Sequence, residues 1–401
     1  MFLVASRATK VWWVAFGATL VLAGCGGESI SSGNSGAAGS AGAAGTAGAG
    51  GTAELGGSGG AGGSGGTSTG GMAGVAGTGG IAGGGGTAGT GGTADDLPEA
   101  YAISKLYLGD TLPDGTPSAT AWRDYGRDID GQVSDASSVD HCELSPGATS
   151  SVKQDGTDGI DNAFGANIMP VILGLSSDAS ATVNQSIVDG DFTKLLQIEY
   201  LASGGNSGPA WLYTGEPMSS PPVWDGDDVW PLACEGMTQC LVASTPQLDQ
   251  GNASLLTFPA TTISNGLWVS GSQIDMDLDL PIMGFSLMMK VRHTSMKAHF
   301  DSGVPPIGAT FGVLSGVLDT EELIEAFRTA AGTISTSLCS GATFDSIAMQ
   351  LRASSDIMSD GTQQAGQLCN GISMGMGFDL EAARLGQVND KRPEPVDPCA
   401  P

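Results

Sequence analysis

Residues 274–280 read Ile-Asp-Met-Asp-Leu-Asp-Leu, and this strict alternation of apolar and acidic side chains indicates the fold class. A period of two places all the apolar side chains on one face of an extended strand. The same kind of alternation recurs at 196–200, 285–291 and 372–378. We therefore expect each stretch to be a strand with one buried face, with the acids of 274–280 on the wet side of a sheet.

Helical patterns are fewer. Asp319-Thr320-Glu321-Glu322 has the form of a capping box, and the apolar residues after it share one helix face as far as Gly332, where we expect the helix to end. Residues 343–353 and 180–188 are two further candidate helices. Because strands outnumber helices, we predict that residues 95–401 form a β-rich α+β domain with a mainly antiparallel, sandwich-like sheet and two or three short helices.

Before this domain, residues 26–94 consist mainly of Gly, Ala, Ser and Thr. Such a segment buries too little apolar surface to offset the entropy of ordering it, so we expect a disordered linker. A glycine-rich coil of this length has a root-mean-square reach of about 45 Å. The segment therefore predicts a flexible stalk that carries the domain away from whatever holds its N-terminal end.

An export signal is expected at residues 1–24. Arg7 and Lys10 give the first ten residues a positive charge, and an apolar run follows from Val11 to Leu22. A membrane-spanning helix needs about 20 apolar residues, so this run is too short to span a bilayer and is typical of a signal peptide.

The run ends in Leu22-Ala23-Gly24-Cys25, which resembles the lipobox of bacterial lipoproteins. The resemblance implies that the signal is removed, that Cys25 becomes the new N-terminus, and that it carries a diacylglyceryl group and further fatty acid such as palmitate. Two or more acyl chains give stable membrane anchoring, whereas one is marginal. Gly26, in place of Asp, resembles lipoproteins sorted to the outer membrane, with the surface and periplasmic leaflets both open. An ordinary secretory signal is the alternative.

The chain carries 15 basic and 42 acidic residues, a formal net charge of −27. Such a surface repels nucleic acid phosphates and anionic lipid headgroups, so nucleic acid is excluded as a partner. The acidity suits solubility, or the binding of cations.

Cysteine usage agrees with export. Besides Cys25, the candidates for disulfide formation are six residues: Cys142, Cys234, Cys240, Cys339, Cys369 and Cys399. An even number in an oxidising compartment predicts three disulfides, for which 15 pairings exist. Our working hypothesis pairs sequence neighbours, Cys234 with Cys240 and Cys339 with Cys369, which leaves Cys142 for Cys399. A metal site is the alternative, but the chain contains no Cys-x-x-Cys. The stretch from Cys339 to Cys399 resembles a module of functionally uncharacterised lipoproteins, to which no activity attaches.

Acidic loops are the clearest candidate for a cofactor site, and the cofactor that they suggest is Ca²⁺. The ligands that we predict are Asp128, Asp130, Asp155, Asp158 and Asp161. Hard carboxylate oxygens on glycine-containing loops are the ligands that Ca²⁺ prefers. No twelve-residue loop ending in a bidentate Glu is present, and solvated acids in Asx turns are the alternative.

A possible glycan platform lies at Trp224 and Trp230, which bracket Asp225-Gly226-Asp227-Asp228. Aromatic rings beside acids can stack on a sugar, but such tryptophans more often pin a loop to the core.

A catalytic site is much less favoured. Gly205-Asn206-Ser207-Gly208-Pro209 resembles the nucleophile motif of trypsin-like serine proteases, and His141-Cys142 echoes their His-Cys pair. One glycine is missing, no Ala-Ala precedes the histidine, and the separation of 66 residues is too short, so a turn before a strand at 210–213 is the better interpretation. His293 and His299 would lie about 20 Å apart on a regular strand, too far to share a metal unless a turn at Thr294-Ser295 brings them together.

These observations favour a lipid-anchored cell-envelope lipoprotein with a non-catalytic binding or structural role, whose partners are the membrane and polysaccharide or envelope proteins. A calcium- or glycan-binding surface module is the second hypothesis. An envelope hydrolase without an intact motif is the third.

Overall fold

The folded part of the chain is known from a computed structural model. It describes residues 100–202, 204–238, 240, 253–282, 285–303, 306–392 and 396–400. These residues belong to one compact unit, Gly85–Pro401. The predicted signal peptide, Cys25 and the glycine-rich linker lie outside the described residues. Within the described part, no helix has both the length and the apolar character needed to cross a bilayer.

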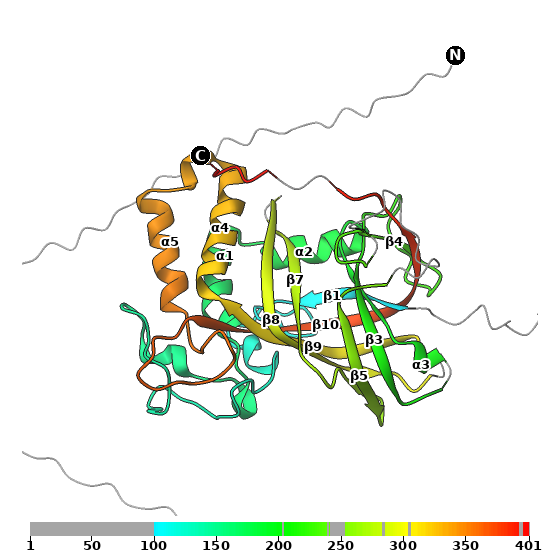
Figure 1. Ribbon diagram of the computed structural model, residues 1–401, viewed down its shortest axis with the longest axis horizontal. Helices are drawn as coiled ribbons and strands as arrows, with labels where there is room; N and C mark the ends of the chain where they lie inside the picture. The colour runs from blue at the N-terminus through cyan, green and yellow to red at the C-terminus, as the bar shows by residue number, and fades with distance from the viewer. Residues whose placement is uncertain are drawn as a thin grey trace, which may run out of the picture. The chain divides into compact units, whose positions relative to one another are not determined.

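The described residues form a β-rich α+β fold around one sheet, as predicted (Figure 1). Its strands are β1 (Ala100–Tyr107), β2 (Lys194–Gln197), β3 (Ser207–Thr214), β4 (Val229–Leu232), β5 (Thr257–Ser264), β6 (Leu267–Val269), β7 (Ile274–Ile282), β8 (Phe285–Phe300), β9 (Gly308–Asp319) and β10 (Gly371–Val388). All of the pairs are antiparallel except β4 with β10. The predicted strand at 196–200 is wrong in its second half, because the extended segment ends at Gln197 and a helical turn follows.

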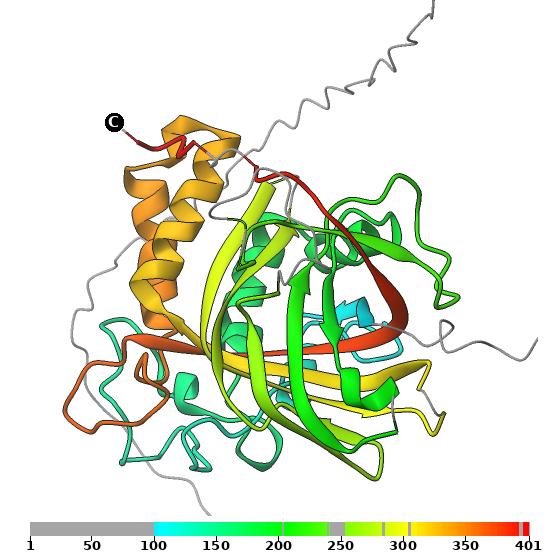
Figure 2. The same cartoon turned by 45° about the vertical axis from the view of Figure 1, so that its right-hand side comes forward.

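The sheet closes on itself. Strands follow the order β1-β2-β3-β5-β6-β8-β9-β10, and β10 also pairs with β1. The halves that face each other therefore belong to one continuous sheet rather than to two separate ones. In Figures 1 and 2, β10 passes behind β7 and β8, on the opposite side of the enclosed core.

Strand β8 makes this closure possible because it changes partner along its length. Its first half pairs with β7 and its second half with β6, and the register shifts between Arg292 and Ser295. His293, inside the shift, has a positive φ of 52°. Such irregularities bend a strand and increase its twist, which lets the sheet curve round.

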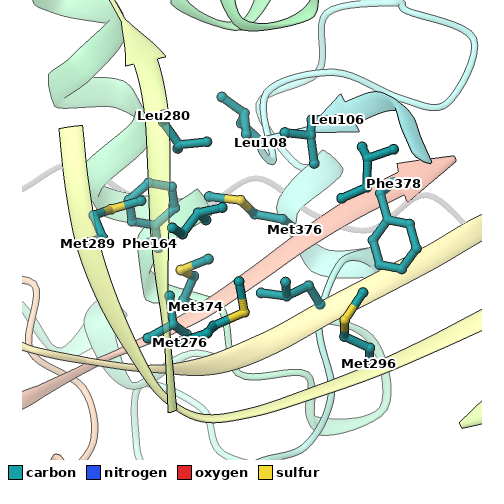
Figure 3. Packing of buried hydrophobic residues seen from close by; sticks show 14 of the residues in the cluster. Leu106, Leu108, Phe164, Met276, Leu280, Met289, Met296, Met374, Met376 and Phe378 are labelled. Atoms are coloured by element: carbon teal, nitrogen blue, oxygen red, sulfur yellow. The ribbon is translucent and has the colours of Figure 1, made fainter. Parts of the chain in front are cut away.

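The interior is filled by side chains, many of them methionines (Figure 3). Met276, Met289, Met296, Met374 and Met376 are all at most 3% exposed. Methionine is flexible enough to fill an irregular space between curved strands. A pocket among Met276, Met296, Met376 and their neighbours has a volume of only about 10 Å³, too little for a ligand.

On the outer side of β10, glycines alternate with these methionines. A Cβ at Gly375 would overlap the carbonyl oxygen of Tyr125, and one at Gly377 would lie 2.6 Å from the Tyr125 ring. The glycines therefore allow residues 108–163, which we call the loop layer, to pack directly on the strand.

Within the described ranges, five helices accompany the sheet: α1 (Met169–Leu175), α2 (Ala179–Val188), α3 (Glu199–Ala202), α4 (Thr320–Ile334) and α5 (Ala342–Ala353). Short helical turns occur at Ala121–Asp124, Ser150–Lys153, Thr157–Gly159, Phe164–Ile168 and Thr336–Leu338. The predicted helices at 180–188, 319–332 and 343–353 are confirmed. The Asp319 carboxylate accepts hydrogen bonds from the amides of Glu321 (3.1 Å) and Glu322 (3.2 Å), which confirms the cap.

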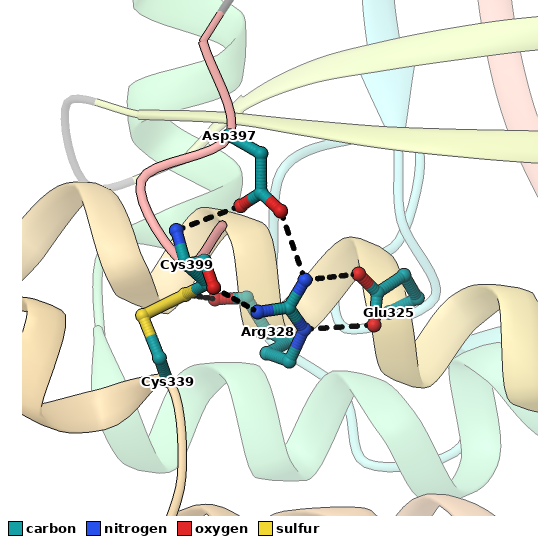
Figure 4. Close-up of polar contacts among 5 residues, drawn as sticks. All are labelled: Glu325, Arg328, Cys339, Asp397 and Cys399. Carbon is teal, nitrogen blue, oxygen red and sulfur yellow. Dashed lines mark hydrogen bonds and ion pairs between the residues drawn. A yellow bond between two sulfur atoms is a disulfide. The ribbon is translucent and has the colours of Figure 1, made fainter. Parts of the chain in front are cut away.

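Helix α4 runs past Gly332, the predicted stop. A Cβ there would overlap the sulfur of Cys399 and lie 3.0 Å from that of Cys339, so this glycine makes room for a disulfide instead of ending the helix. The C-terminal segment returns along α4, where Arg328 binds Glu325, Asp397 (3.0 Å) and the carbonyl of Cys399 (3.3 Å), as Figure 4 shows.

Three disulfides link Cys142 with Cys369, Cys234 with Cys240, and Cys339 with Cys399. The Cys234–Cys240 pair is confirmed. The hypothesis that Cys339 pairs with Cys369 and Cys142 with Cys399 is wrong. The C-terminal segment docks on α4 beside Cys339, while Cys142 and Cys369 lie next to a short parallel bridge between Glu143 and Leu368.

Candidate functional site

The strongest candidate site is an acidic cluster in the loop layer. Asn162 holds this layer on the sheet: its Nδ2 donates to the carbonyls of Trp122 (3.1 Å) and Tyr125 (2.9 Å), and its Oδ1 accepts from the amides of Gly165 (2.9 Å) and Gly375 (3.0 Å). This buried side chain therefore ties the segment that follows Asp161 to residues 122–125 and to β10.

Three of the predicted calcium ligands converge here. One carboxylate oxygen from each of Asp128, Asp130 and Asp161 lies within 4.8 Å of the others. An antiparallel bridge between Arg127 and Asp161 brings the two segments together, and Asp161 Oδ2 accepts from the amide of Ile129 at 2.6 Å.

The loop also turns back on its own acids. Asp128 accepts from the amide of Gly131 (2.6 Å), and Asp130 accepts from that of Gln132 (2.8 Å). Gly131 has a φ of 79°, which glycine adopts without strain. These bonds are the Asx turns considered as an alternative, so the turns and the convergence of the acids exist together.

Burial raises the pKa of Asp161 to about 9, with the negative charges of Asp130 and Asp356 adding to the effect. Asp155 lies beside it and accepts from the amide of Ser134, and burial raises its pKa to about 6. At neutral pH Asp161 therefore holds a proton. A crowded set of acids lowers its repulsion either by keeping a proton or by binding a cation.

Asp356 is a member of this group that the sequence did not indicate. It is 7% exposed, and burial raises its pKa to about 7, while hydrogen bonds from the Ser373 amide and hydroxyl act in the opposite direction. Gln363 connects the parts, because its Nε2 donates to Asp130 (2.9 Å) and to the Asp356 carbonyl (3.0 Å). Its Oε1 accepts from the amide of Cys142 at 3.0 Å.

The other predicted ligand, Asp158, is not one of the converging acids. It lies on the turn Thr157–Gly159 with a positive φ of 54°. The cluster therefore contains Asp128, Asp130 and Asp161, with Asp155 and Asp356 against it.

The tryptophan platform is not supported at Trp230, which is fully buried. The two ring centroids are 6.1 Å apart, and only Trp224 is partly exposed. Asp228 is buried and accepts from the amides of Val223 (2.9 Å) and Trp224 (2.6 Å), so this acid shapes the turn. Trp230 is a core residue, and the pair corresponds to the loop-pinning alternative.

The protease-like residues do not form a catalytic group. His141 is buried against the Cys142–Cys369 disulfide, and its Nδ1 lies 3.1 Å from the carbonyl oxygen of Cys142. Ser207 is the first residue of β3, where it pairs with Thr262. Although His141 and the two sulfurs lie close together, disulfide sulfurs are not thiolate ligands, so they do not form a metal site.

Comparisons with known proteins give no further guide, since no family model, curated protein or solved structure is similar to this chain.

Proposed function

We propose that this chain is an exported lipoprotein, anchored through acyl chains on Cys25, whose glycine-rich linker carries a disulfide-stabilised, non-catalytic binding domain. The outer membrane is the proposed location. Its partners are then molecules outside the cytoplasm, polysaccharide or envelope proteins among them.

One observation supports this proposal above the others: the six cysteines after Cys25 pair with one another. Complete pairing fits an oxidising compartment. It also leaves none of these six cysteines to pair with Cys25, so the Cys25 thiol is free of a disulfide with them, as its acylation requires. The binding role is favoured over hydrolysis because the protease-like His141 is buried against a disulfide.

Expression of the wild type and of Cys25→Ser, followed by membrane fractionation, tests the proposal. The wild type should enter the detergent-soluble membrane fraction, and the variant should remain uncleaved or be released. If both distribute identically after the signal has been removed, the anchor is refuted.

Exposure on the cell can be measured with the same strains. Between Lys10 and Lys105 the sequence has no Lys or Arg, so trypsin cannot cut the linker, whereas an elastase that cleaves after alanine can. Release of the domain from intact cells by elastase but not by trypsin would place it on the outer surface. Release only after the outer membrane is opened would place it in the periplasm.

Calcium binding is a second candidate function, favoured by the convergence of Asp128, Asp130 and Asp161 oxygens within 4.8 Å. Melting of the full mature protein in chelator and in millimolar Ca²⁺ tests it. We expect Ca²⁺ to raise the melting temperature of the wild type and of Asp135→Asn, an exposed acid in a neighbouring turn, but not that of Asp128→Asn. Equal melting of the wild type in both buffers would refute the calcium site.

A further inference from the structure

A hollow of about 510 Å³ lies where β8 changes partner from β7 to β6. Residues 270–273 connect β6 with β7 and form one side, and β8 and β9 form the floor. Arg127 reaches it from the loop layer. The volume lies within the usual range for small-molecule sites, about 300–1,000 Å³.

The floor is the outer face of the sheet. Met296 points into the core, so its strand neighbours Ser295 and Lys297 point outward. Across the ladder, Ser295 pairs with Ser315, and Lys297 pairs with Val313. Hydroxyl and ammonium groups therefore line one continuous surface.

The rim is held in place by Ser270. Its hydroxyl accepts from the amide of Met296 (3.1 Å) and donates to the carbonyl of Ser272 (3.0 Å). These bonds tie the connection to β8, so the hollow is a fixed feature of the fold and does not depend on a loose loop.

The charge of the hollow is opposite to that of the chain. Its charged lining residues are Arg127 and Lys297, both positive, in a protein of net charge −27. The buried Arg127 Nε has no hydrogen-bond partner among the described residues. The half-buried Arg127 therefore adds a positive guanidinium to the lining of the hollow.

We propose that this hollow binds a small hydroxylated anion of monosaccharide size. Arg127 and Lys297 hold its carboxylate or phosphate, and Ser295 bonds its hydroxyls. A guanidinium fork suits both anionic groups, and the serines and the size of the hollow suit a sugar. This inference goes beyond the lipid-anchored role and depends neither on the anchor nor on calcium binding.

Titration calorimetry of the full mature protein in detergent, at low salt and in chelator, tests it. The probes are glucuronate for the carboxylate and glucose 6-phosphate for the phosphate, with glucose and acetate as controls. At least one anionic sugar should bind saturably, at least tenfold more tightly than either control. The probe that binds more tightly, glucuronate or glucose 6-phosphate, shows whether the hollow holds a carboxylate or a phosphate. Absence of saturable binding by both anionic sugars, or equal binding of glucose, would overturn the proposal.

Two variants locate the binding. Lys297→Gln, at an exposed site, should weaken it at least tenfold without affecting folding, and Arg127→Gln should also weaken it at least tenfold. Lys290→Gln, on the same strand but paired with Asp277 outside the hollow, is the matched control and should bind as the wild type does. Unchanged affinity in Lys297→Gln and Arg127→Gln, when both are folded, would show that the sugar binds elsewhere and would refute the site.

Discussion

Substitution of Asp161 by Asn should change how the stability of the domain depends on pH. The carboxyl has a pKa of about 9 in the folded state, against an ordinary value of 3.8. Between these values the folded chain keeps a proton that the unfolded chain has lost. The contribution of this carboxyl to the free energy of unfolding is therefore fully present below pH 3.8. It falls as the pH rises from 3.8 towards 9.

The magnitude follows from the size of this pKa difference. One proton costs about 1.4 kcal/mol per pH unit, so between pH 6.5 and pH 8 Asp161 should remove about 2 kcal/mol from the free energy of unfolding. Asn has no proton to lose, and its side-chain oxygen can still accept from the amide of Ile129. The variant should therefore lack this part of the loss and be relatively more stable at pH 8.

The pH window is chosen so that other titrating groups contribute little to the pH dependence of the free energy of unfolding. Burial lowers the pKa of His141, which affects stability mainly below pH 6.5, and burial of Lys194 lowers its pKa to about 8, which affects stability above pH 8. Asp155 and Asp356, with pKa values of about 6 and 7, act in the same direction as Asp161 but are present in both proteins.

The assay is urea unfolding at 25 °C in chelator, with the disulfides intact, at four pH values from 6.5 to 8. Asp135→Asn, in an exposed turn, is the control and should keep the wild-type slope. Parallel pH profiles for the wild type and Asp161→Asn would refute the buried-proton account of the cluster.

Three more predictions test the fold by urea unfolding. Asp319→Ala should cost about 1 kcal/mol, because it removes the acceptor at the start of α4; no loss would show that the cap is not stabilising. Gly375→Ala should cost about 2 kcal/mol or more through overlap with the loop layer, whereas Gly174→Ala, in α1 with open space around it, should not destabilise; equal effects would contradict the close packing. Cys142→Ser opens a disulfide spanning 227 residues and should cost about 3 kcal/mol more than Cys234→Ser, which opens one spanning 6; the reverse order would contradict the chain-entropy argument.

Local patterns in the sequence predicted the local structure well. The alternation at 274–280 became β7, and the capping pattern at Asp319 became the start of α4. Both signals depend on residues within one turn or one strand. The failure at 196–200 has the same origin: three apolar residues in alternation suit a strand, but the chain turns into α3 after Gln197.

Long-range structure was not predictable in the same way. Periodicity shows which face of a strand is buried, but not which strand lies beside it, so the closure of β10 onto β1 had no local signal. The disulfides failed for the same reason, since Cys142 and Cys369 are joined by folding of distant loops. The sequence predicted one part of the candidate site, because Asp128, Asp130 and Asp161 lie in neighbouring acidic loops. It did not predict Asp356, which comes from a segment about 200 residues later in the chain.

Mass spectrometry of the mature N-terminus tests the proposed function most directly. Cleavage after Glu28 would release the short peptide Cys25-Gly26-Gly27-Glu28 from the membrane-extracted protein. The proposal predicts this peptide with the added mass of a diacylglyceryl group and further fatty acid, and none of it from Cys25→Ser. The same peptide with an unmodified thiol, or a mature N-terminus at another residue, would contradict the proposal.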